Sequence, residues 1–80
     1  MNSIEKTVLR KLYTRKVIGK HHIRLATLLK CGWKPHERGL VKDAVESLLK
    51  QKLIIWAKRS KEALKLNKEY MAAIEQVVKS

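Results

Sequence analysis

The 80-residue sequence predicts a mainly helical domain with one small β-hairpin. Three segments carry apolar residues at the three- and four-residue spacing of an amphipathic helix. Residues 53–66 instead place residues typical of strands on both sides of a polar turn. No internal repeat or linker interrupts the chain, so residues 1–80 are expected to form a single domain.

A first helix is expected from residue 3 to about residue 15. Asn2 is a candidate N-cap, and Glu5 stands three residues later, in the position of a capping box. After this helix, Gly19 can adopt backbone angles closed to other residues, so a short extended segment is expected at residues 17–19. The apolar stripe of the helix is Ile4, Val8, Leu9, Leu12 and Tyr13.

A second, short helix is expected to begin near residues 20–22, with Gly32 as its left-handed C-terminal cap. Pro35 is well suited to the first turn of a third helix, at about residues 35–51. Two helices joined by so few residues predict a helix-turn-helix. The stripe of the third helix is Leu40, Val41, Ala44, Val45, Leu48 and Leu49.

Residues 53–58 and 63–66 are expected to form two strands around the polar turn at residues 59–62. Asn67 is a candidate N-cap for a last helix at about residues 67–79. This helix can pack on the first helix or on the same helix of a second chain, and we favour the homodimer. Its stripe is Tyr70, Met71, Ile74, Val77 and Val78.

The charge is the strongest compositional feature. Nineteen Lys and Arg against seven Asp and Glu give a net charge of +12 and a pI near 10.2. Such an excess attracts polyphosphate, and nucleic acid is the first partner to consider. The alternative is a charged, solvated surface of the kind found in thermophiles, but such surfaces usually balance Lys with Glu.

The chain is expected to be a cytoplasmic, nucleoid-associated protein. No apolar run approaches the roughly 20 residues of a membrane helix, and the N-terminus lacks the apolar stretch of a signal peptide. The lone Cys31 cannot form an internal disulfide, which is compatible with a reducing compartment.

The order of these elements resembles the winged helix-turn-helix DNA-binding family over essentially the whole chain. The segments at residues 18–22, 35–39 and 64–67 look more narrowly like small archaeal stand-alone winged-helix proteins. The resemblance implies that the third helix enters the major groove and that the hairpin, or wing, lies along the DNA backbone. Family members commonly have Gly where this chain has Lys52, so the end of the third helix is expected to be looser or shifted.

The residues expected to contact DNA lie in three places: before the second helix, at the start of the third helix, and on the wing. Arg38 can bridge guanine O6 and N7, and His36 can donate to a base or a phosphate. Glu37 either accepts from cytosine or, as we favour, complements the helix dipole and holds Arg38. Gly39 allows close approach of DNA or, more commonly, of another helix. The full set is Lys20, His21, His22, Lys34, His36, Arg38, Lys42, Lys58, Arg59 and Lys61.

The sequence gives little indication of a metal site, a base-stacking surface or a catalytic site. The three histidines and Cys31 are zinc-ligand types, but their spacing matches no compact zinc motif, so neither a metal nor a cofactor is expected. Trp33 and Trp56 are expected in the core rather than stacked on bases. No catalytic constellation is evident, so an enzyme is not expected. Two rival functions stay open: an RNA-bound structural protein, and a winged-helix module that docks other proteins.

Overall fold

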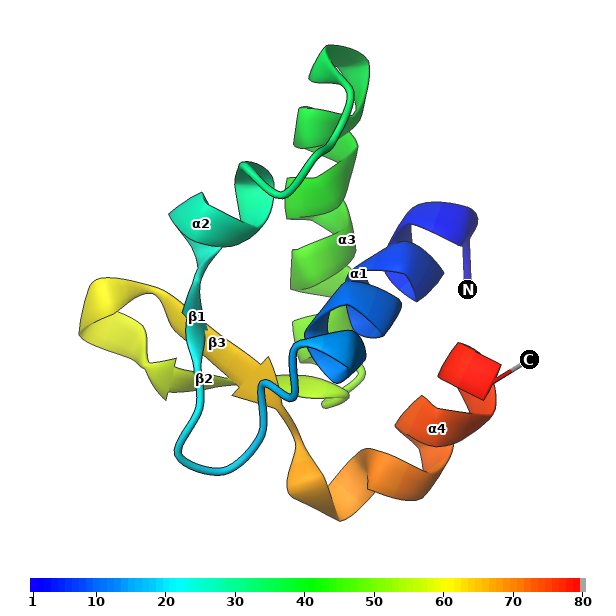
Figure 1. The fold of residues 1–80 in the computed structure, drawn as a ribbon, viewed down its shortest axis with the longest axis vertical. Helices are drawn as coiled ribbons and strands as arrows, with labels where there is room; N and C mark the ends of the chain where they lie inside the picture. The colour runs from blue at the N-terminus through cyan, green and yellow to red at the C-terminus, as the bar shows by residue number, and fades with distance from the viewer. Residues whose placement is uncertain (80) are drawn as a thin grey trace.

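Helices dominate the chain, and a small sheet lies at one side of them (Figure 1). The computed structural model describes residues 1–79. The mainly helical character and the small hairpin predicted from the sequence are confirmed. Within the described residues the elements are α1 (Ser3–Thr14), β1 (Ile23–Arg24), α2 (Leu25–Leu29), the 3-10 helix η1 (Pro35–Glu37), α3 (Arg38–Lys50), β2 (Ile54–Lys58), η2 (Arg59–Lys61), β3 (Ala63–Leu66), η3 (Lys68–Tyr70) and α4 (Met71–Lys79).

The strands form one antiparallel sheet in the order β1-β3-β2. Ile54 of β2 pairs with Leu66 of β3. On the other side of β3, Ile23 of β1 pairs with Leu64. Because side chains alternate along a strand, Leu64 and Leu66 point to the same face, and both are fully buried. The central strand therefore supplies the sheet's main contribution to the core.

The short strand before the second helix lies later than predicted. Residues 17–18 of the expected extended segment form no strand, and the chain turns at Gly19, which has φ of +65°. Pairing instead begins at Ile23, and the second helix begins at Leu25 rather than near residue 20. The carbonyl of Val17 still accepts a hydrogen bond from the backbone N–H of Leu66, at 2.8 Å. The chain reverses direction at Gly19, so Ile23 is the first residue after the turn that pairs with β3.

α1 contacts both α3 and α4, so it lies between them in the helical layer. Leu9 and Leu12 of α1, Leu48 of α3 and Ile74 of α4 are all fully buried in one apolar cluster. The last helix thus packs on the first, which is one of the two arrangements that its stripe allows. In Figure 1 the chain termini lie on the same side of the molecule.

Two members of the predicted apolar stripes are exposed. Leu40 keeps 51% of its surface and Tyr70 keeps 38%. The first turns of α3 extend beyond α1 (Figure 1), so Leu40 lines a shallow hollow with Ile4 and Asp43 instead of entering the core. Tyr70 belongs to η3, before α4 begins. Both expectations failed because the apolar side chains of a helix are buried only where another element packs against them.

α1 and α3 both end in a Schellman motif with lysine at the left-handed position. After α3, the N–H of Lys52 donates to the carbonyl of Leu49, and the N–H of Leu53 donates to that of Leu48. Lys52 has φ of +64° and Lys16, after α1, has φ of +54°. The prediction that the helix end at Lys52 is loose or shifted is therefore wrong, because lysine takes the conformation that glycine usually supplies.

Both predicted N-cap residues make capping hydrogen bonds, although Asn67 caps the 3-10 turn η3 and the last α-helix begins only at Met71. The side chain of Asn2 accepts a hydrogen bond from the N–H of Glu5 at 2.8 Å, and that of Asn67 accepts one from the N–H of Glu69 at 3.1 Å. The capping box at Glu5 is only half formed, because its carboxylate accepts hydrogen bonds from Ser47 and Gln51 instead. Within residues 1–79, no helix is both long enough and apolar enough to cross a bilayer.

Candidate nucleic-acid interface

The tip of the β2–β3 hairpin gathers exposed cations. Lys58, Arg59 and Lys61 are all exposed, and the chain turns back after them at Glu62, with φ of +49°. The carbonyl of Glu62 accepts a hydrogen bond from the N–H of Leu25 at 2.9 Å, which holds the tip against the start of α2. The hairpin tip is thus a fixed cationic projection at the left edge of Figure 1.

Arg24 also lies beside this tip, although it was not among the residues expected to contact DNA. Arg24 pairs with Ala63 in the sheet and is exposed. Together with Ser60, Lys61 and the acidic Glu62 it lines a small hollow beside the hairpin tip. Sequence alone could have found it only through the correct position of β1, because the pairing with Ala63 is what brings Arg24 beside the tip.

The start of the third helix is a 3-10 turn rather than an α-helical turn. The Glu37 carboxylate accepts a hydrogen bond from the backbone N–H of Lys34 at 3.0 Å, and the N–H of Glu37 donates to the Lys34 carbonyl at 2.8 Å. Glu37 therefore caps its own turn as an acidic residue at the start of the helix, in line with the favoured helix-dipole role, but it makes no ion pair with Arg38, so the expectation that it holds Arg38 is wrong. Lys34, His36 and Arg38 are exposed around this turn.

The outer face of α3 carries charges of both signs. Lys42 and Lys50 are exposed there, and so are Asp43 and Glu46. Gly39 is also exposed, and a Cβ added to it would meet nothing within 4 Å. Tight helix packing is therefore not the reason for this glycine. A polyanion would meet cations mainly around η1 and the first turn of α3, because the next turns of α3 place carboxylates on the same face.

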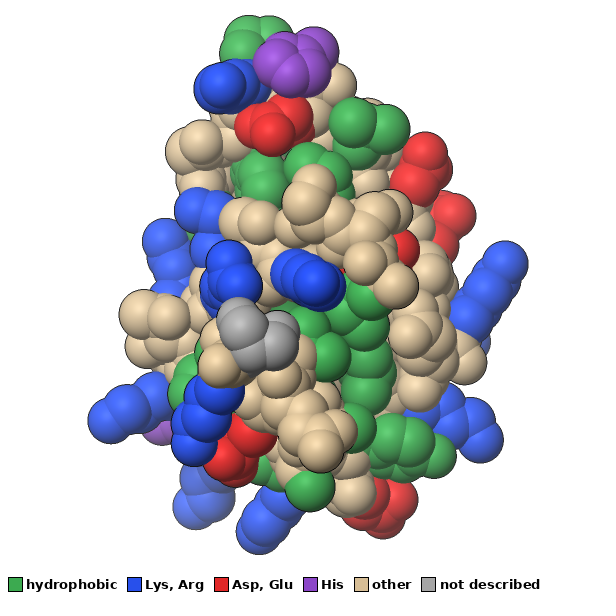
Figure 2. Space-filling model, turned by 90° about the vertical axis from the view of Figure 1, so that its right-hand side faces the viewer, with side chains coloured by type: hydrophobic (Ala, Val, Ile, Leu, Met, Phe, Trp, Pro, Cys, Tyr) green, Lys and Arg blue, Asp and Glu red, His purple; other side chains and the backbone are tan. Residues whose placement is uncertain are grey.

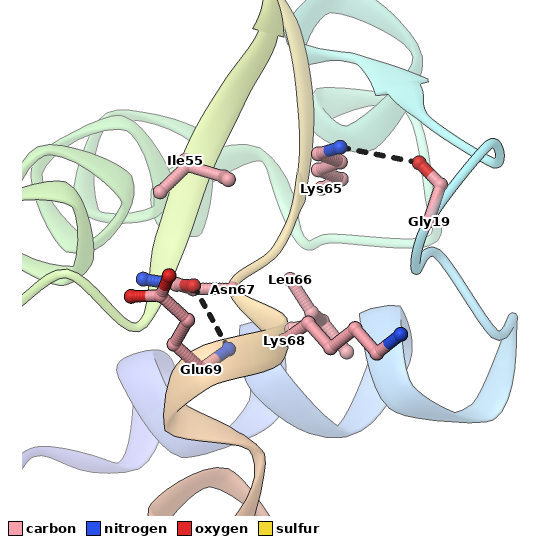
Figure 3. A pocket seen from close by; sticks show the side chains of 7 residues that line it. All are labelled: Gly19, Ile55, Lys65, Leu66, Asn67, Lys68 and Glu69. Atoms are coloured by element: carbon pink, nitrogen blue, oxygen red, sulfur yellow. Dashed lines mark hydrogen bonds between the residues drawn. The ribbon is translucent and has the colours of Figure 1, made fainter.

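Lys20, His21 and His22 are exposed on the loop that leads into β1. The loop is tied to the sheet, because Nζ of Lys65 donates to the Gly19 carbonyl at 3.2 Å (Figure 3). In Figure 1 this loop is at the bottom of the molecule and the first turn of α3 is at the top. The structure therefore separates residues 20–22, which we expected to contact DNA, from the start of the third helix.

A hollow on the outer side of the sheet adjoins the same loop. Gly19, Ile55, Lys65 and Asn67 lie around it (Figure 3). Asn67 is largely buried, with 9% of its surface exposed, and its side-chain amide donates to the Lys52 carbonyl at 2.7 Å. Its polar groups are thus occupied in joining the end of α3 to the start of η3, which gives this hollow a structural role.

The metal-ligand residue types do not converge. Among residues 1–79, no group of three or more His, Cys, Asp or Glu could hold a metal ion. The Cys31 thiol instead donates to the Thr27 carbonyl at 3.2 Å. Trp33 is buried, and its Nε1 donates to the Leu28 carbonyl at 2.8 Å, while Trp56 is half-buried against the core. The expected core role of both tryptophans is confirmed.

Carboxylates neutralise few of the cations. In the part of the chain that the structure describes, the one ion pair joins Lys79 and Glu75, at 3.2 Å. The hydrogen bond to Glu75, followed by the charge of that carboxylate, raises the pKa of Lys79. No carboxylate lies within ion-pair distance of the other Lys and Arg side chains of residues 1–79. Lys and Arg side chains accordingly project around much of the outline in Figure 2.

Comparisons with known proteins add no relative to this picture. No protein-family model, curated protein or solved structure matches the chain.

Proposed function

We propose that this chain is a winged helix-turn-helix protein that binds double-stranded DNA without catalysing a reaction, as a transcription regulator or chromatin-associated factor. The observation that carries the proposal is the hairpin tip, where Lys58, Arg59 and Lys61 are exposed beside Arg24 and none is in an ion pair. Cations held on a fixed projection are suited to the phosphates beside a groove. The net charge of +12 and the order of the elements support the same function.

In this proposal η1 and the first turn of α3 enter the major groove. Arg38 has the planar guanidinium that bridges guanine O6 and N7, and His36 donates to a base or a phosphate. Lys34 and Lys42 contact phosphates on either side. Asp43 and Glu46 face outward one turn further on, and their charge opposes a deeper insertion of the helix. The wing then supplies the backbone contacts that fix the orientation.

A gel-shift titration with random duplex DNA at several salt concentrations tests the proposal. We expect binding at low salt that weakens as salt rises, because each phosphate contact releases counterions. Absence of binding at low salt, or an affinity that salt does not change, would contradict it. Structured RNA as a competitor tests the rival function: RNA that displaces the duplex at equal concentration points to an RNA-bound role.

Two single substitutions separate specific contacts from backbone contacts. Arg38→Ala should lower the discrimination between DNA sequences, by roughly 1–3 kcal/mol at one base pair, because it removes a base contact. Lys61→Ala should weaken all duplexes alike and reduce the salt dependence by about one phosphate contact. The measurement is the affinity for a selected sequence and for a scrambled one. Equal effects of the two substitutions would contradict these roles.

A homodimer through α4 is the remaining part of the proposal. α4 packs on α1, so a second chain would have to use its outward surface and the adjoining Tyr70, which is 38% exposed. Two recognition helices would then meet successive major grooves. Sedimentation equilibrium measures the mass of the protein in solution. A mass of two chains would support the dimer, and a mass of one chain would contradict it.

A further inference from the structure

A second cationic surface lies on the outer side of α1. Thr7, Arg10, Lys11, Thr14 and Arg15 line one shallow hollow there, and these five residues are called the α1 basic face. Arg10, Thr14 and Arg15 are exposed, and the other two are half-buried. The surface holds three cations and two hydroxyl groups, and its hollow is lined by no carboxylate.

The charge of this face is not neutralised by its own helix. The only carboxylate of α1 is Glu5, which is 8% exposed and accepts hydrogen bonds from Ser47 and Gln51 of the α3 region. It therefore lies on the opposite, buried side of the helix. α3 differs in this respect, because Asp43 and Glu46 share its outer face with the lysines. α1 thus offers the more uniformly positive helix face.

One cation of the face is also fixed in position. Nζ of Lys11 lies 5.1 Å from the centroid of the Trp33 ring, within the range of a cation–π interaction. Trp33 itself is 8% exposed and is held by its hydrogen bond to the Leu28 carbonyl. The positioned ammonium group shares its hollow with two arginines, and ammonium and guanidinium groups are the donors that phosphate oxygens accept from.

We infer that the α1 basic face binds the phosphate backbone of a second DNA duplex, so that one chain can hold two duplexes together. The inference rests on the proposed function, in which the first duplex occupies the wing and the first turn of α3. In Figure 1 the hairpin tip is at the left edge of the molecule and α1 lies on the right. The hollow of the α1 basic face shares no residue with the hollow beside the hairpin tip, so the two cationic surfaces are distinct. The cations and hydroxyl groups of this face suit hydrogen bonds to the phosphates and sugars of DNA. Such contacts carry no preference for a base sequence.

A capture experiment tests this inference. One duplex is attached to beads, limiting protein is added, and retention of a second, fluorescent duplex is measured. Arg10→Gln/Arg15→Gln removes two charges from the α1 basic face and leaves Lys11 on Trp33. The matched control, Lys50→Gln/Lys68→Gln, removes two exposed charges elsewhere. Binding of a single duplex is measured in parallel by anisotropy.

We expect the unmodified protein and the control to capture the second duplex, and the Arg10/Arg15 variant to capture at least about tenfold less. Its affinity for a single duplex should stay within about threefold of that of the unmodified protein, since the wing contacts remain. If the variant captures the second duplex as well as the unmodified protein does, the inference is overturned. A homodimer that bridges the two duplexes without the α1 basic face would give this result. Failure to bind even one duplex would instead overturn the proposed function.

Discussion

Lys52 holds a conformation that lysine rarely takes, and its surroundings account for it. Its φ of +64° places Cβ close to the following carbonyl, which costs roughly 1–2 kcal/mol. Two capping hydrogen bonds follow from this conformation, together with the contact between Leu48 and Leu53, both of which are buried. The Asn67 amide then binds the Lys52 carbonyl at 2.7 Å. These interactions depend on the backbone geometry and not on the lysine side chain.

Lys52→Gly should therefore stabilise the protein. Relief of the left-handed strain exceeds the roughly 0.4–1 kcal/mol by which glycine stabilises the unfolded chain, so the free energy of unfolding should rise by about 0.5–1 kcal/mol. Lys50→Gly is the matched control, because Lys50 ends α3 in a helical conformation, and it should lower the same quantity by up to about 1 kcal/mol. Urea denaturation followed by circular dichroism measures both. A loss of stability in Lys52→Gly would show that the side chain contributes more than the strain costs.

Among the elements, α1 and α3 are joined by a polar contact as well as by their apolar faces. The Glu5 carboxylate accepts from Nε2 of Gln51 at 3.2 Å and from Oγ of Ser47 at 3.4 Å. Nε2 of Gln51 also donates to Oγ of Ser47 at 3.1 Å, so the three side chains form a closed set. This contact fixes the start of α1 against the last turn of α3.

Glu5→Ala should weaken this junction. The substitution removes both hydrogen bonds to a charged acceptor and should lower the free energy of unfolding by about 1–3 kcal/mol. Glu46→Ala is the matched control, because Glu46 is exposed on α3 and makes no ion pair, and its effect should stay within about 0.5 kcal/mol. Thermal and urea unfolding of the two variants can be compared directly. Equal stabilities would mean that the apolar faces alone hold the two helices together.

The elements that sequence predicted well are those determined by local signals. The start of α1 follows from the Asn2 cap, and the hairpin follows from strand-forming residues around a polar turn. The position of β1 was not predictable in this way, because it depends on which residue comes level with Leu64 after the turn at Gly19. The exposure of Leu40 likewise depends on how far α1 covers α3.

At the scale of the whole molecule, composition predicted the sign of the surface charge but not how that charge is distributed. All ten residues expected to contact DNA are exposed. The structure nevertheless separates residues 20–22 from the first turn of α3, puts Asp43 and Glu46 on the outer face of α3, and places Arg24 beside the hairpin tip. Net charge is a sum over the chain, so it cannot tell which cations face the same ligand.

The salt dependence of binding distinguishes a defined interface from a diffuse one. In the proposed complex, six cations at the hairpin tip and the start of the third helix face phosphates, namely Arg24, Lys34, Lys42, Lys58, Arg59 and Lys61. If each contacts one phosphate, the plot of log affinity against log salt concentration should have a slope of about −5. Contacts from all 19 Lys and Arg would give a slope of about −17.

Anisotropy titrations of one short duplex between 50 and 200 mM KCl measure this slope. A slope of about −5 means that affinity falls by about a thousandfold over this range, which is large enough to measure. A slope steeper than about −10 would show that a single duplex also reaches cations outside the wing and α3, such as those of the α1 basic face. That result would contradict the separation of the two surfaces, because both would then serve one duplex.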